Sequence, residues 1–180
     1  MDDRTDAEIV SAVLVGDEAA FGALVGRYQN SFIRFATRML NSQDDAEDVL
    51  QSAFIRAYRN LASCRDRARF GAWLQKIVVN ECRTFGGRRG KREARFDTRP
   101  ATLASIGTES VSERTELAEE IQSALQRLPA EQREAFVLRY VEDLGYEEMS
   151  ELTGAGVSAL KMRVKRACES MRALLEGVVS

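Results

Sequence analysis

The 180-residue sequence contains no histidine, and it has only three cysteines and two prolines. Without histidine, the chain lacks the commonest general base, the usual partner of serine and cysteine nucleophiles, and the commonest zinc ligand. Cys64, Cys82 and Cys168 are far apart and form no C-x-x-C pair, so we expect reduced thiols. We therefore predict no catalytic site, no metal site and no cofactor, and a protein that is not an enzyme.

Long apolar runs are also missing. No stretch approaches the roughly 20 apolar residues that a membrane-spanning helix needs. The first residues, Met1-Asp2-Asp3, lack the basic start of a secretory signal. We therefore expect a cytoplasmic protein.

The net charge of -2 hides four blocks of alternating sign. The net charge is -4 over residues 1–60, +7 over 61–100, -8 over 101–160 and +3 over 161–180. Two basic blocks separated by acidic ones predict two anion-binding surfaces on one chain. The alternative is that the charges belong to the solvated faces of ordinary helices.

Nearly every periodic segment has helical spacing, and a stretch without periodicity separates two groups of helices. The sequence from Gly86 to about Ser112 is rich in Gly, Ser, Thr and Arg. This segment is too long to be an ordinary loop inside a compact domain. We predict an all-α fold of two small helical domains, 1–88 and 115–180, joined by a flexible linker, 89–114. The helices are expected at about 5–15, 17–39, 43–61, 70–85, 117–128, 130–144, 146–152 and 158–175.

The last two helices predict a helix-turn-helix. A short helix, 146–152, is followed by the glycine-containing turn 153–156 and by a longer basic helix, the order in which the second helix enters the major groove. At 100° per residue that helix has two faces. The apolar face holds Val157, Leu160, Val164, Ala167 and Met171. The opposite face and its flanks hold the candidate DNA-binding residues Ser158, Lys161, Met162, Arg163, Lys165 and Arg166, together with Glu169.

An acidic face is predicted on the helix over 43–61. Asp44, Asp48, Gln51 and Ile55 share this face, which lies away from the broad apolar side. The helix dipole explains acidic residues in the first turn, but it does not explain Asp48 or an exposed Ile55. A protein partner with a basic, partly apolar surface would explain both, and a simple solvated face is the alternative.

Basic residues surround the start and the end of the helix over 70–85. Such residues, interleaved with aromatic rings, can follow a phosphate backbone and stack unpaired bases. Phe70 is expected in the core, whereas Trp73 fits either the core or a base contact, with the core favoured. The basic residues are Arg65, Arg67, Arg69, Lys76, Arg83, Arg88, Arg89, Lys91 and Arg92.

Four motifs together resemble a bacterial RNA polymerase sigma factor of the extracytoplasmic-function group. They are Asp44-Asp45-Ala46-Glu47-Asp48-Val49-Leu50-Gln51 with Phe54, then Phe70-x-x-Trp73-Leu74-x-x-Ile77-x-x-Asn80, then Leu128-Pro129, and Tyr146-Glu147-Glu148. The resemblance covers nearly the whole chain and implies the partners core RNA polymerase, promoter DNA and an anti-sigma factor.

The resemblance also implies roles for the candidate residues. Asp44, Asp48, Gln51 and Ile55 would bind core polymerase. The terminal helix would read the minus-thirty-five promoter element through the six residues given above. The minus-ten element would be bound and opened by Ser63, Arg65, Arg67, Arg69, Lys76, Asn80, Arg83, Arg88 and Arg89. Two alternatives remain, a stand-alone helix-turn-helix regulator and an interaction protein that mimics a sigma factor.

Overall fold

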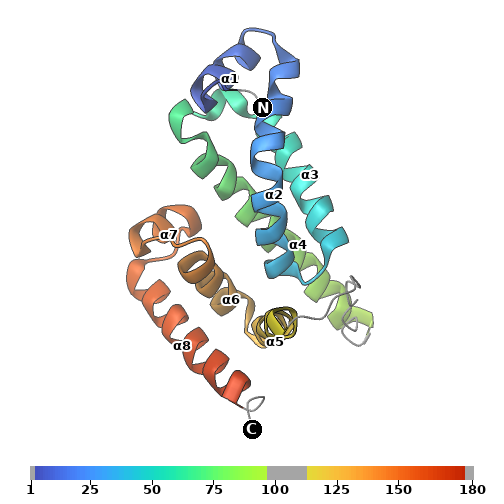
Figure 1. The fold of residues 1–180 in the computed structure, drawn as a ribbon, viewed down its shortest axis with the longest axis vertical. Coiled ribbons are helices and arrows are strands. Elements are labelled where there is room, and N and C mark those ends of the chain that lie inside the picture. Colours follow the sequence, from blue (N-terminus) through green and yellow to red (C-terminus); the bar gives the residue numbers. More distant parts are fainter. Residues whose placement is uncertain (1–2, 97–112, 177–180) are drawn as a thin grey trace. The chain divides into compact units, whose positions relative to one another are not determined.

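The protein is described here by a computed structural model covering residues 3–96 and 113–176, and these residues form helices, turns and loops without a strand (Figure 1). The all-α prediction is therefore confirmed. The chain divides into two compact units, Met1–Arg99 and Pro100–Ser180. Within the described ranges, no helix is long and apolar enough to cross a membrane.

Residues 3–96 of the first unit form four α-helices and three short 3-10 turns. Helices α2, α3 and α4 pack on one another, and α1 packs on α2 and on the turn before α4 (Figure 1). The elements are α1 (Asp6–Leu14), η1 (Glu18–Ala20), α2 (Phe21–Leu40), α3 (Gln43–Arg59), η2 (Leu61–Ser63), η3 (Arg67–Arg69) and α4 (Phe70–Phe96).

Capping side chains mark the helix starts of the first unit. The Thr5 hydroxyl accepts from the Glu8 backbone N–H at 3.3 Å, and the Glu8 carboxylate accepts from the Thr5 backbone N–H at 2.7 Å. This reciprocal pair satisfies two backbone donors that a helix start leaves open. The Ser42 hydroxyl caps α3 by accepting from the Asp45 N–H at 3.2 Å.

The core of the first unit is built from apolar stripes along α2, α3 and α4. Leu24 and Phe35 of α2, Ala53 of α3, and Phe70 and Leu74 of α4 are all almost completely buried. Because these residues recur every three or four positions, each helix presents one continuous apolar side to its neighbours.

The predicted end of the fourth helix at Gly86-Gly87 is wrong, because α4 continues to Phe96. Each glycine costs about 1 kcal/mol of helix stability relative to alanine, but a tertiary contact lies beyond the pair. Arg89 Nη1 lies 2.8 Å from Asp45 Oδ2 at the start of α3. Residues 89–96 of the predicted linker are thus helical. Residues 97–112 lie outside the described residues, and the domain boundaries stay a prediction.

The second unit consists of α5 (Glu113–Arg127), α6 (Ala130–Phe136), the π-helical turn η4 (Val137–Val141), α7 (Tyr146–Thr153) and α8 (Val157–Glu176). Pro129 precedes α6, as expected for a residue that cannot donate a backbone hydrogen bond. The core side chains, all buried, are Leu125, Leu138, Met149, Leu152, Leu160, Val164 and Met171.

Candidate nucleic-acid and protein interfaces

Helices α7 and α8 form the predicted helix-turn-helix. The Glu148 carboxylate accepts from the Gly145 backbone N–H at 2.8 Å and so satisfies a donor at the start of α7. Gly154 ends α7 with φ of 72°, a left-handed conformation that favours glycine and allows a short turn before α8.

The buried face of α8 fixes the orientation of its basic face. Leu160, Val164, Ala167 and Met171 are buried as predicted, while Val157 is only partly covered. The opposite side of the helix consequently faces solvent. The exposed side chains there are Ser158, Lys161, Met162, Lys165, Arg166 and Glu169, and Met162 is 49% exposed.

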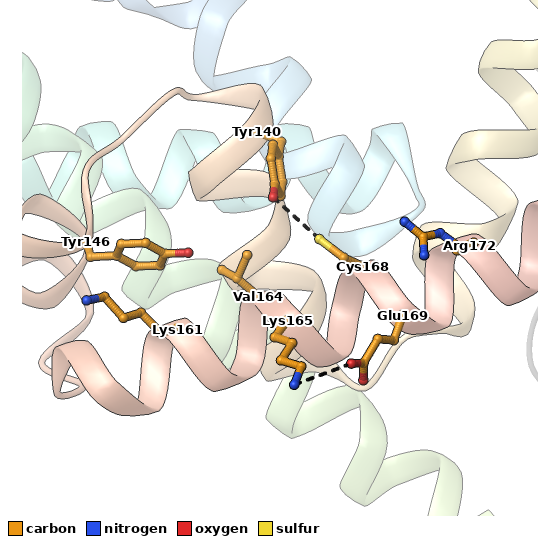
Figure 2. A pocket seen from close by; sticks show the side chains of 8 residues that line it. All are labelled: Tyr140, Tyr146, Lys161, Val164, Lys165, Cys168, Glu169 and Arg172. Carbon is orange, nitrogen blue, oxygen red and sulfur yellow. Dashed lines mark hydrogen bonds and ion pairs between the residues drawn. The ribbon is translucent and has the colours of Figure 1, made fainter.

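One flank of this exposed face borders a surface hollow of about 340 Å³ (Figure 2). The Lys161 ammonium lies 5.6 Å from the centre of the Tyr146 ring, a cation–π arrangement, and Lys165 lies 3.8 Å from the Glu169 carboxylate. The Cys168 thiol lies 3.5 Å from the Tyr140 hydroxyl. The ring under Lys161 was not foreseen, because Tyr146 comes from the preceding helix.

The other flank of α8 borders a second hollow, of about 410 Å³. Among the candidate DNA-binding residues of α8, Arg163 is half-buried, with 26% of its side chain exposed. Its Nη2 atom lies 2.7 Å from Glu131 Oε2 of α6. The hollow is lined by Pro129, Ala130, Glu131, Gln132, Ala159, Met162, Arg163 and Arg166.

The acidic face of α3 is exposed in the first unit. Asp44, Asp48, Gln51 and Ile55 all face solvent, and Ile55 is 46% exposed. The opposite side of the helix is buried, as predicted for an amphipathic helix. Tyr58 extends the exposed apolar surface one turn further, with its ring 5.2 Å from that of Phe21.

The candidate residues before α4 lie in an exposed loop built from η2 and η3. Ser63, Arg65, Arg67 and Arg69 are all exposed. Arg67 Nη1 donates to the Ser11 hydroxyl at 2.8 Å, which ties the loop to α1. Sequence reasoning missed Ser11, because 56 positions separate the two residues and no local pattern links them.

The candidate residues on α4 do not all lie on one face. Lys76, Asn80 and Arg83 follow the helical spacing of four and three residues and share a side, where Lys76 and Asn80 are exposed and Arg83 is half-buried. At 100° per residue, Arg88 and Arg89 lie more than 100° around the helix from Lys76. Arg88 is exposed, whereas Arg89 is half-buried in its ion pair with α3.

The two aromatic residues at the start of α4 have different environments. Phe70 is fully buried, as expected. Trp73 is half-buried, with its ring centre 5.7 Å from that of Phe70. One part of the indole thus packs on the core while another part reaches the surface, so core packing and a base contact are compatible.

No metal site accompanies these surfaces in the described part of the chain. Within residues 3–96 and 113–176, no group of three or more Cys, Asp or Glu side chains is arranged to hold a metal ion.

Models of two regions of the sigma-70 family match the chain. Sigma-70 region 2 matches residues 24–92, which include the acidic face of α3 and most of α4. Sigma-70 region 4 matches residues 118–171, which include the helix-turn-helix. The two units thus carry the two regions in sigma-70 order.

Curated relatives narrow the family to one group. The ECF RNA polymerase sigma-E factor of Haemophilus influenzae is 34% identical over 175 residues, covering 92% of each chain. The RNA polymerase sigma-H factor of Pseudomonas aeruginosa is 31% identical over 184 residues, covering 97% of this chain and 95% of the relative. The chain belongs to the extracytoplasmic-function (ECF) group of RNA polymerase sigma factors, which confirms the resemblance and makes it a transcription initiation factor.

Solved structures agree with this assignment. The structure of CnrH in complex with the cytosolic domain of CnrY aligns with a TM-score of 0.68 and 29% identity, covering 96% of this chain and 97% of that one. The sigma factor RpoE, in complex with the anti-sigma factor NepR from Bartonella quintana, aligns with a TM-score of 0.67 and 25% identity, covering 87% and 96%.

Proposed function

We propose that this sigma factor docks on core RNA polymerase through the acidic face of α3 and reads two promoter elements with its two units. The basic face of α8 reads the minus-thirty-five element. The loop over η2 and η3 and the Lys76 side of α4 bind and open the minus-ten element. The observation that carries the proposal is that the acidic face of α3 and the basic face of α8 are exposed while the opposite side of each helix is buried.

The acidic face of α3 has the chemistry of a protein interface rather than of a solvated face. A half-exposed Ile55, two helical turns beyond Asp48, gains free energy by burial against an apolar partner, while Asp44 and Asp48 steer a basic partner into register. Transferring the exposed 46% of the Ile55 side chain out of water contributes on the order of 1 kcal/mol to binding. The charges of Asp44 and Asp48 raise the association rate and the specificity.

The exposed face of α8 has the chemistry of major-groove recognition. Lysine and arginine donate to guanine O6 and N7 or to phosphates, and a half-exposed Met162 is suited to contact with thymine methyl groups. Burial of Leu160 and Val164 holds this face in one orientation, so the donors reach the groove with little loss of rotational freedom on binding.

Strand opening follows from capture of unpaired bases by the first unit. Three exposed arginines in the η2–η3 loop, Arg65, Arg67 and Arg69, attract the single strand, and the surface part of Trp73 offers a ring for stacking. A flipped base exchanges its stacking in the duplex, worth a few kcal/mol, for contacts in the protein, so binding shifts the equilibrium toward the open state. The nucleotidyl transfer itself belongs to the polymerase.

Control by an anti-sigma factor is part of the proposal. It is supported by the similarity to RpoE, which was solved in complex with the anti-sigma factor NepR. Such a partner would inhibit by covering the polymerase-binding surface, because one face of α3 cannot contact two proteins at once.

The test is promoter-dependent run-off transcription with purified core polymerase. Asp48→Arg should reduce both polymerase association and transcript yield, because it reverses the charge at the centre of the acidic face without touching buried side chains. Asp3→Arg makes the same charge change at an exposed residue off this face and should leave both unchanged. Unchanged association in Asp48→Arg would remove α3 from the interface.

The same assay separates the two alternatives. A sigma mimic would bind core polymerase and give no promoter-dependent transcript. A stand-alone regulator would bind its DNA site tightly as a duplex without polymerase, which a band shift with the protein alone would reveal.

A further inference from the structure

A tight ion pair joins Arg163, on the helix expected to read DNA, to Glu131 at the start of α6. The Arg163 Nη2 atom lies 2.7 Å from the Glu131 carboxylate, with Arg163 26% and Glu131 71% exposed. The Lys165–Glu169 pair on the other flank of α8 is looser, with 3.8 Å between the charged atoms. The short distance and partial burial single out the first pair as one that holds its arginine in place.

The pair lies inside the exposed face rather than behind it. Arg163 lines the same 410 Å³ hollow as Met162 and Arg166, which project from the exposed face of α8, and Glu131 enters that hollow from the start of α6. A DNA base edge that contacts Met162 and Arg166 would therefore lie beside the Glu131–Arg163 pair.

The chemistry of the pair favours a base over a phosphate. A guanidinium has five N–H donors, so one donor can bond Glu131 while others remain for a pair of acceptors such as guanine N7 and O6. The carboxylate neutralises the arginine and repels a phosphate. It also holds the arginine in one rotamer, which lowers the entropy lost when a base is bound.

We infer that Glu131 is a positioning residue that holds Arg163 for base recognition and lowers its affinity for the DNA backbone. The inference rests on the proposed role of α8 in reading the minus-thirty-five element and adds a residue outside the helix-turn-helix. Glu131 thereby exchanges overall affinity for sequence preference, as repulsive groups do at selective interfaces.

The experiment uses holoenzyme reconstituted from core polymerase and the full-length chain. Its binding is measured on promoter fragments in which the upstream element is randomised one position at a time. In Glu131→Gln, the preference for one base at one position of the element should fall about fivefold to tenfold. The affinity for DNA that lacks the element should rise, and the slope of the logarithm of the binding constant against the logarithm of salt concentration should steepen by about 0.9. Glu151→Gln makes the same charge change on exposed α7 and should do neither.

A second variant links the effect to the arginine. Arg163→Lys keeps the charge but loses the planar pair of donors, so it should lose preference at the same position as Glu131→Gln, and the double variant should lose no more. Unchanged preferences in Glu131→Gln, or a uniform change across all sequences, would overturn the inference. An exposed ion pair contributes less than about 1 kcal/mol, so the variants should fold, as helicity by circular dichroism will verify.

Failure of this inference is distinguishable from failure of the proposed function. Arg166→Ala in the same library should weaken binding or alter a preference if α8 reads the element. If Arg166→Ala has an effect and Glu131→Gln has none, the reading helix stands and the positioning role falls. If neither has an effect, the assignment of α8 itself is refuted.

Discussion

Gly71 is predicted to be important for the packing of the first unit. It is the second residue of α4, and a Cβ atom there would lie 2.7 Å from the Tyr28 hydroxyl oxygen and 2.9 Å from its Cε1. Tyr28 cannot swing away freely, because its hydroxyl donates to the Asp6 carboxylate and its ring stacks on Phe32 at 5.7 Å between centres.

The size of the effect follows from two opposing contributions. Overpacking against an anchored ring costs about 1 to 3 kcal/mol. Replacing glycine by alanine in a helix returns up to about 1 kcal/mol. Gly71→Ala should therefore lower the free energy of unfolding by up to about 3 kcal/mol, with a midpoint of about 1.5 kcal/mol, through displacement of Tyr28 from its partners.

A matched control isolates the steric contribution. Gly22 is the second residue of α2 and also follows a phenylalanine at the helix start, but a Cβ atom added there would meet nothing within 4 Å. Gly22→Ala should therefore raise the free energy of unfolding by up to about 1 kcal/mol. The two variants are expected to shift stability in opposite directions.

Urea unfolding followed by tryptophan fluorescence is the assay. Trp73 is the single tryptophan of the chain and lies in the first unit, so its signal reports that unit alone. Tyr28→Phe in the Gly71→Ala background should recover part of the loss, since it removes the nearest atom. If Gly71→Ala proves as stable as Gly22→Ala, the predicted clash carries no cost and the reasoning fails.

Two further outcomes are expected in the first unit. Burial and the hydrogen bond to Asp6 raise the pKa of Tyr28 above its ordinary value, so the folded state retains this proton more strongly than the unfolded state. The stabilisation is complete below about pH 10 and is lost as pH rises. Between about pH 9 and about pH 11, the free energy of unfolding measured in urea should therefore fall more steeply with pH in the parent than in Tyr28→Phe. Equal slopes of this free energy against pH would contradict the prediction. Asp45→Ala and Arg89→Ala should show a coupling free energy of about 0.5 to 1 kcal/mol in a double-mutant cycle, and additive effects would mean that their ion pair does not stabilise α4 beyond Gly86-Gly87.

The faces of the helices could be predicted from the sequence with few errors. Apolar spacing along α8 predicted burial of Leu160, Val164 and Met171, and therefore exposure of Met162 and Arg166. The prediction succeeds because the period of a helix is a local property: once a segment is helical and one stripe is buried, the opposite stripe must face solvent.

The partners of charged side chains could not be predicted in this way. Arg163, Arg67 and Arg89 were all predicted to bind DNA, yet each is bonded to a side chain on another element. A long flexible arginine can reach any acceptor within several ångströms, so its partner depends on how the helices pack. Nothing in the local sequence around these arginines identifies that partner.

The sequence by itself determined an all-helical chain, the two groups of helices and the exposed faces, because amphipathic spacing acts over a few neighbouring residues. Only the tertiary structure decided how far α4 extends and which cations are held by carboxylates. Asp45 and Arg89 are 44 positions apart, and their ion pair lies beyond two glycines that a local interpretation takes as a helix end. Such contacts form only after α3 and α4 have packed, since packing brings distant charges within reach of one another.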